Sequence, residues 1–356
     1  MSRIPYLAEA AMTPHQLRRS QELVASRGGA PVTGPGAFWL YNPHISEVAE
    51  PLRLHMERAT SLPLSLSELA ILITARHWSA TYAWCRHEPQ AIQDGIDPGA
   101  VAAIRDGGTP VFSDPRAAMV YDVARQLLQT GHLDDVTYAR ALDAFGLATL
   151  VDLVTMVGYG SQVSLANATF EPDAPAGATD YLPSGEPPVV PPARTLTSNG
   201  AVDDAAGLIG DAARAWRHCP KILERAGDYD VMLSRHLNMA PAMSWLIVLV
   251  MARYWSAQSL WPGLYRQALD HGVDRKIADA VARGVGPDDL SEGQAAVYDF
   301  ARELLTAGRP SEATFARVLD RFGFATMIET TAIIGFMTII ALPANVFSAE
   351  RTSGRI

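Results

Sequence analysis

Apolar residues recur at intervals of three and four positions along most of the chain, a pattern typical of amphipathic helices, whereas strand-like alternation is rare. The second half repeats the order of the first from about residue 202. We therefore expect an all-α fold. In the first half the pattern predicts helices over residues 14–27, 44–58, 66–79, 82–94, 98–107, 115–130, 135–145 and 147–167.

Capping and turn residues delimit these predicted helices. Asp97-Pro98 and Asp114-Pro115 each place a side-chain acceptor before a proline in the first helical turn. Gly95 and Gly131 fall where left-handed C-caps are expected. Ser65-Leu66-Ser67-Glu68 has the spacing of a capping box, which predicts that Glu68 is the third residue of its helix.

Two stretches of the chain match each other without a gap at an interval of 177 residues (220 − 43). An internal repeat of this length indicates two copies of one fold. We predict a first domain over residues 1–170, including an N-terminal helical arm, and a second, degenerate domain over residues 201–356. The matched positions include Ala75–Trp84 with Ala252–Trp261, Trp39 with Trp216, Pro43 with Pro220, Gly146 with Gly323 and Gly158 with Gly335.

Residues 171–200, between the two copies, are rich in proline. This composition predicts an extended, semi-rigid connector rather than a packed element. The connector is long enough to wrap around the partner domain. Its prolines are Pro172, Pro175, Pro183, Pro187, Pro188, Pro191 and Pro192.

The composition narrows the function further. A formal net charge of −9 without any Lys/Arg run argues against a nucleic-acid partner. The two cysteines, Cys85 and Cys219, lie in different halves and predict no disulfide framework. Histidines 44, 55, 77 and 132 show no ligand spacing with a carboxylate or with one another, so we expect no metal.

One segment, Thr330–Ala349, carries no charged residue and is nearly long enough to span a bilayer. Its polar Thr338 and Asn345 favour a buried helix in the core or in a subunit interface. The start of the chain lacks the apolar region of a secretory signal. We therefore expect a soluble, cytoplasmic protein without a membrane partner.

The repeat is asymmetric in its ionisable residues. Glu68 corresponds to Trp245 in the other copy, and His87 corresponds to Leu264. On the predicted helix, His87 shares one face with Ala80 and Ala83, at i, i+3 and i+7. Loss of an acid and a base from one copy indicates where chemistry resides in the other, so we predict that Glu68 and His87 are catalytic.

Four neighbours are candidate substrate-binding residues. Arg76 ends the preceding predicted helix and suits an anionic substrate, and Tyr82, Trp84 and Tyr159 supply aromatic walls. A structural role for Arg76 and Trp84 is the alternative, because the other copy keeps both residue types, at Arg253 and Trp261. For Glu68 the alternative is a purely local capping role.

Two acids recur on the long apolar helices of both copies. Asp152 in the first copy corresponds to Glu329 in the second. A repeated acid on an apolar helix indicates a shared buried partner. We expect ion pairs with Arg76 and Arg253, respectively.

These residues resemble the carboxymuconolactone decarboxylase family, which includes the alkylhydroperoxidase-D-type proteins. The resemblance covers residues 34–170 and, in a degraded form, residues 211–347. It implies two tandem helical domains of the alkylhydroperoxidase-D-like fold. It rests on Glu68, Arg76, the Tyr82-Ala83-Trp84-x-x-His87 run, Phe145-Gly146, and Gly158-Tyr159 followed by an apolar helix ending at Asn167.

The family's peroxidase branch has a CxxC motif, whose cysteine positions here hold Ala80 and Ala83. Peroxide reduction by a dithiol is therefore not expected. The decarboxylase-like branch lacks the cysteines. It implies a cofactor-independent lyase that acts by proton transfer on a small anionic lactone or unsaturated carboxylate. In this reading Arg76 holds a carboxylate, His87 protonates a carbanion or enolate, and Glu68 orients His87.

Two alternatives remain open at this point. One is a non-catalytic ligand-binding or oligomer-scaffold protein of the same fold. The other is a hydrolase or isomerase that uses the same pocket. The family's single-repeat chains form rings of helical subunits, so the resemblance also implies a homo-oligomer.

Overall fold

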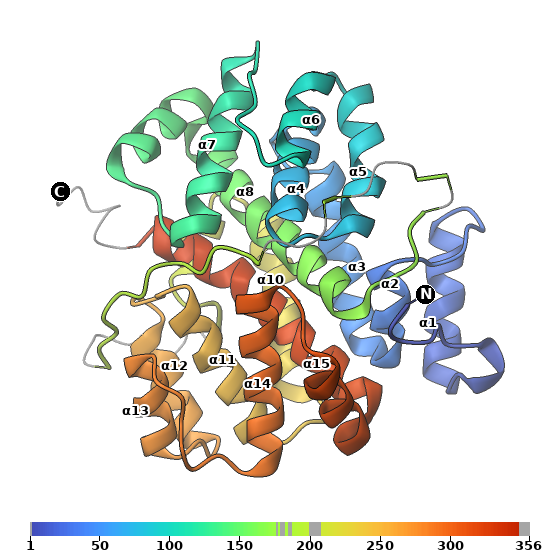
Figure 1. Cartoon of the computed structure of the whole chain (residues 1–356), viewed down its shortest axis with the longest axis vertical. Coiled ribbons are helices and arrows are strands. Elements are labelled where there is room, and N and C mark those ends of the chain that lie inside the picture. The colour runs from blue at the N-terminus through green and yellow to red at the C-terminus, as the bar shows by residue number, and fades with distance from the viewer. Residues whose placement is uncertain (1, 176, 179–181, 184–186, 199–207, 349–356) are drawn as a thin grey trace.

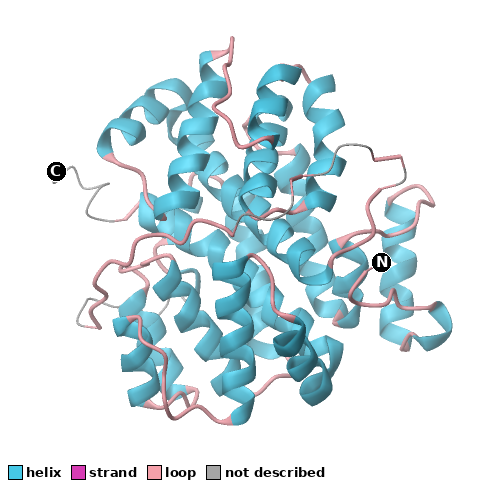
Figure 2. Cartoon of the chain, in the orientation of Figure 1, coloured by secondary structure: helices cyan, strands magenta, loops and turns pink. Residues whose placement is uncertain are grey.

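The computed structural model describes residues 2–175, 177–178, 182–183, 187–198 and 208–348. Within these ranges the regular elements are helices, with no strand (Figure 2). The predicted all-α class is therefore confirmed. The expected start of the second copy near residue 202 lies outside the described residues.

The helices of the first half follow the predicted ranges to within a few residues. The two helices expected over 135–145 and 147–167 form one element, whose backbone breaks at Gly146 with φ 71° and ψ 167°. The helices are α1 (Pro14–Ser26), α2 (Pro35–Phe38), α3 (Pro43–Arg58), α4 (Leu64–His77), α5 (Thr81–Gln93), α6 (Pro98–Arg105), α7 (Pro115–Thr130) and α8 (Asp135–Phe170).

The helices of the second half recur at the interval of the sequence repeat. Both ends of α3 and α10, of α4 and α11, and of α7 and α14 differ by 177 residues. Gly323 breaks α15 as Gly146 breaks α8. The helices are α9 (Ala212–Trp216), α10 (Pro220–Arg235), α11 (Pro241–Tyr254), α12 (Trp261–Asp270), α13 (Arg275–Arg283), α14 (Glu292–Ala307) and α15 (Glu312–Val346).

Most of the predicted caps are present, but the capping box is not. Asp97 accepts a hydrogen bond from Ala100 N, Asp114 accepts one from Arg116 N, and Gly131 is a left-handed C-cap. Helix α4 instead begins at Leu64, because the carbonyl of Pro63 accepts from the first backbone N–H groups of the helix. Glu68 is therefore the fifth residue of α4, and its carboxylate is free of any capping role.

The centre of the molecule is the contact of α8 with α15 (Figure 1). A Cβ atom added to Gly158 would lie 2.8 Å from Ile339 Cα, and one added to Gly335 would lie 2.9 Å from Gln162 Cβ. The two contacts are equivalent, because Gly158 corresponds to Gly335 and Gln162 corresponds to Ile339 at the interval of 177 residues. Each half therefore presents the same surface to the other, as in an isologous interface. Helices α4 and α7 pack on α8, α11 and α14 pack on α15, and α3 packs on α10.

Helices α8 and α15 are long and apolar enough to cross a membrane by length and composition alone. The most apolar stretch of α15 is 94% buried inside the chain, which is typical of the core helix of a globular protein. The described part of the uncharged segment Thr330–Ala349 thus belongs to the core of the chain, and no subunit interface is needed to bury it. Ala349 itself lies outside the described residues.

The described part of the connector is irregular and lies against both halves. Pro187, Pro188 and Val189 line a cavity together with residues of α4 and α7. Farther along, Arg194 N donates to Ser256 Oγ at 3.1 Å, and Thr197 N donates to the side chain of Gln258. The connector therefore crosses from the first half to the second.

We expect Gly158→Ala to lower the free energy of unfolding by about 2 kcal/mol, since its Cβ meets the backbone of α15 rather than a flexible side chain. The matched control is Gly227→Ala in α10, where nothing lies within 4 Å of the added atom. That change should be neutral or stabilising by up to about 1 kcal/mol. Urea unfolding measures both, and equal effects would contradict the packing argument.

Candidate functional site

The structure brings Glu68 and His87 together. Glu68 is on α4 and His87 is on α5, and the two helices pack against each other. His87 Nδ1 lies 2.7 Å from Glu68 Oε2, and the two side chains are 14% and 11% exposed. An ionised carboxylate only accepts, so the Nδ1–H of His87 donates to Glu68.

This bond fixes what the other ring nitrogen can do. With the proton on Nδ1, a neutral His87 carries its lone pair on Nε2, which makes no hydrogen bond within the described residues. A carboxylate that holds the tautomer of an imidazole is the arrangement used in general acid–base catalysis. The pair can therefore accept or deliver one proton at Nε2.

The second half fills the same positions with apolar residues. Leu264 is buried in the core, and the indole of Trp245 stacks on the ring of His271 with centroids 4.9 Å apart. The Glu68–His87 pair thus has no counterpart at the matching positions of the second half.

Arg76 lies away from this pair. It follows Glu68 by eight residues on α4, a rise of about 12 Å along the helix axis. Its Nε donates to the carbonyl of Arg105 at 2.9 Å, and its guanidinium lies against Gly107 at the end of α6. Arg253 lies in the same way against Gly284. This recurrence supports a structural role for both arginines.

Arg76 also lines a cavity of about 180 Å³ that the dyad residues do not line. Arg125 and the imidazole of His77 share this cavity, and connector residues Pro187 and Pro188 form part of its wall. Burial, and then the charge of Arg76, lower the pKa of His77 to about 4. His77 is therefore neutral near pH 7, and among the described lining residues the charged side chains are those of Arg76 and Arg125.

The aromatic candidates occupy three different places. Tyr82 OH donates to Thr33 Oγ1 at 3.0 Å, and its ring packs on Gly34, so it joins α5 to the loop after the arm. Trp84 is fully buried, and a substrate would reach it only if neighbouring side chains moved. Tyr159 OH donates to Glu57 Oε1 at 2.8 Å. Of the six candidate residues, Arg76 alone lines either of the two cavities identified among the described residues.

Tyr159 belongs to a charged network that the sequence analysis missed. Arg53 bonds Glu57 at 2.6 Å and makes two bonds to Glu50, and Arg27 bonds Glu50 from the end of α1. Burial, and then the charge of Glu57, raise the pKa of Tyr159 well above 10. Burial alone would raise the pKa of Glu50, but the bonds and charges of Arg53 and Arg27 outweigh it and lower that pKa.

The i,i+3 and i,i+4 spacing of Glu50, Arg53 and Glu57 is visible in the sequence, but the approach of Tyr159 and Arg27 from other elements is not. The corresponding described positions of the second half do not form this network. Its corresponding residues are Gly227, Asp230, Ser234 and Phe336.

The predicted ion pairs of Asp152 with Arg76 and of Glu329 with Arg253 are wrong. Asp152 accepts from Ser61 N and Oγ, both at 2.6 Å, and Glu329 accepts from the backbone N–H groups of Asn238 and Met239. Ser61 and Asn238 are themselves related by the 177-residue interval. The shared partner is therefore the loop before α4 or α11, whose backbone N–H groups need an acceptor when buried.

Comparison with protein-family models, with curated proteins and with solved structures found no match to this chain.

The Glu50 network predicts a pH dependence of stability. Because the pKa of Glu50 lies below 4.5 in the folded chain, its contribution is complete above about pH 4.5 and is lost as the pH falls through the folded value. Glu50→Gln should lower the free energy of unfolding by about 2 kcal/mol at pH 7. The difference from the wild type should shrink in acid.

Urea titrations at several pH values measure this effect. Glu224→Gln is the control, because Glu224 pairs with Lys221 on an exposed helix face and should change stability little. A Glu50→Gln difference that stays constant down to pH 3 would show that the charge of Glu50 contributes nothing.

Proposed function

We propose that this chain is a cofactor-independent lyase, similar to the carboxymuconolactone decarboxylases, that acts by proton transfer on a small anionic lactone or unsaturated carboxylate. The observation that carries the proposal is the 2.7 Å contact between His87 Nδ1 and Glu68 Oε2 in a largely buried position. Removing the pair from water strengthens the electrostatic coupling on which proton transfer depends.

The proposed step needs one proton donor. Cleavage of the bond to the carboxylate releases CO2 and leaves the electron pair on carbon as a carbanion or enolate. The Nε2–H of a protonated His87 delivers a proton to that carbon, and the ring takes its next proton from water. Glu68 keeps Nδ1 protonated and stabilises the imidazolium before the transfer.

The proposal also covers the origin and setting of the chain. It treats the 177-residue interval as an internal duplication in which the second copy lost its acid–base pair. It further includes a cytoplasmic location and a homo-oligomer built from such two-copy chains. Sedimentation at several protein concentrations tests the assembly.

A non-catalytic ligand-binding or scaffold protein of the same fold is the second candidate. Two cavities favour it, one of about 180 Å³ at Arg76 and one of about 450 Å³ between α1 and α3, because neither Glu68 nor His87 is among their lining residues. The smaller of these cavities holds Arg76 and Arg125, which suits a small anion without any chemistry.

The test is a screen of the purified chain against small lactones and unsaturated dicarboxylates, with product formation followed by NMR. On any substrate that the wild type converts, His87→Ala and Glu68→Gln should each lower kcat by about 10²- to 10⁴-fold. His271→Ala, at an exposed histidine of the second half, is the matched control and should retain full activity.

Circular dichroism of each variant separates loss of chemistry from loss of folding. Full turnover by both dyad variants would overturn the assignment of the site. Binding of carboxylates without turnover by the wild type, abolished by Arg125→Ala and not by His87→Ala, would establish the second candidate instead.

A further inference from the structure

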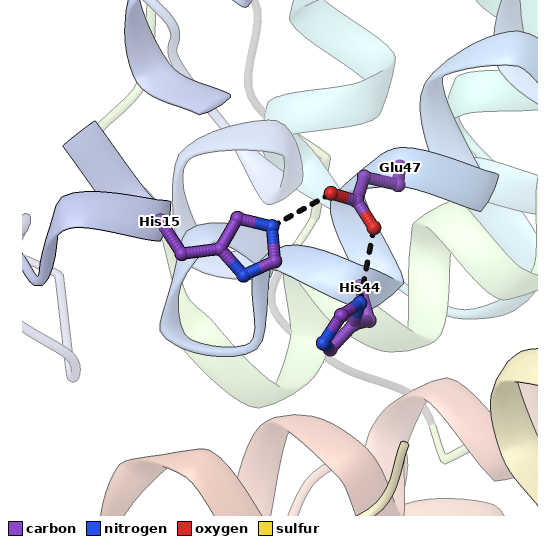
Figure 3. A group of neighbouring side chains, drawn as sticks. All are labelled: His15, His44 and Glu47. Atoms are coloured by element: carbon purple, nitrogen blue, oxygen red, sulfur yellow. Dashed lines mark hydrogen bonds and ion pairs between the residues drawn. The ribbon is translucent and has the colours of Figure 1, made fainter. Parts of the chain in front are cut away.

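Two histidines and one glutamate meet at the junction of α1 and α3 (Figure 3). His15 is the second residue of α1, and His44 and Glu47 lie one turn apart at the start of α3. The expectation of no metal left out His15 and passed over the i,i+3 spacing of His44 and Glu47, which is visible in the sequence. The approach of His15 from a separate element is not visible there.

The donor atoms already converge. His15 Nε2 lies 2.7 Å from Glu47 Oε1, and His44 Nδ1 lies 3.1 Å from Glu47 Oε2. The three ligand atoms all lie within 4.8 Å of one another. In a tetrahedral zinc site with bonds near 2.0–2.2 Å, the donor atoms are about 3.3–3.6 Å apart. Small side-chain rotations would bring the three donors to that spacing.

The surroundings hold these side chains in place. The ring of His44 stacks on that of His236 from the end of α10, with centroids 4.1 Å apart, and contacts His15 edge-on at 4.8 Å. One turn farther along α1, Arg19 donates to the carbonyl and hydroxyl of Ser46. These contacts fix α1 against α3, so that most of the cost of ordering the site has been met before any ion binds.

The corresponding positions of the second half hold no such cluster, and they show which residues are enough to form the start of this helix. There Lys221 and Glu224 replace His44 and Glu47 and form an ordinary i,i+3 ion pair at 2.8 Å. Pro192 of the connector stands at the position of His15. A lysine serves the helix as well as a histidine does, so helix stability alone does not account for two imidazoles facing one carboxylate.

We propose that His15, His44 and Glu47 bind a divalent transition-metal ion of the zinc type. Two imidazoles and one carboxylate form a donor set found in three-ligand zinc sites, which leave one position to water. The three side chains are one-third to two-fifths exposed, so an ion reaches them from solvent. The bound ion would fasten the arm helix α1 to α3, independently of the Glu68–His87 pair.

The test uses the tag-free full chain, stripped with a chelator, in calorimetric titrations with Zn²⁺. The wild type should bind one ion per chain, and His15→Ala and His44→Ala should each weaken binding at least tenfold. His271→Ala should bind as the wild type does. Co²⁺ in place of Zn²⁺ should give the visible absorption of a four-coordinate ion in the wild type and in the control variant.

Equal Zn²⁺ affinity in the wild type and in a His15→Ala/His44→Ala double variant would overturn the proposal. So would stoichiometric binding that disappears in His271→Ala. A rise in the thermal midpoint on adding Zn²⁺, seen in the wild type and absent in the double variant, would support the fastening role. None of these readouts depends on catalytic activity, so failure here leaves the proposed function untouched.

Discussion

The close approach of α8 and α15 is the constraint on which the rest of the structure depends. Gly158 and Gly335 remove the side chains that would hold the two backbones apart, and each half contributes the same glycine to the contact. Interiors are packed too densely to absorb an added methyl group at such a point. Helices α4 and α11 pack on this pair, so the positions of Glu68 and of its counterpart Trp245 follow from it.

Each long helix also carries one buried acid that holds a loop. Asp152 anchors the loop before α4, and Glu329 anchors the loop before α11. The two halves share this device and their glycine contacts, and they differ where the first half holds Glu68, His87 and the Glu50 network. The residues that the two halves share thus form the scaffold, and Glu68, His87 and the Glu50 network distinguish the first half from the second.

How far the sequence could predict the fold depended on local signals. Caps such as Asp97 and Gly131 are recognised from residues within one helical turn of them in the sequence. The predicted helix ranges therefore agree with the structure. The capping box failed because Pro63 offers an earlier start, and Glu68 then became available to His87. That pair was accessible through the asymmetry of the repeat. The partners of Tyr159 and the meeting of His15 with His44 arise from tertiary packing, which spacing along one helix does not encode.

The connector and helices α9 to α14 separate α8 from α15 in the sequence, although α8 and α15 are neighbours in space. During synthesis the first half therefore emerges with the apolar face of α8 uncovered, and that face stays uncovered until most of the second half has left the ribosome. Pairings between segments so distant along a chain form late, and exposed apolar surface in the interval promotes aggregation. The arrangement that gives this protein its central core thus leaves an apolar helix face exposed during synthesis, a condition that favours aggregation.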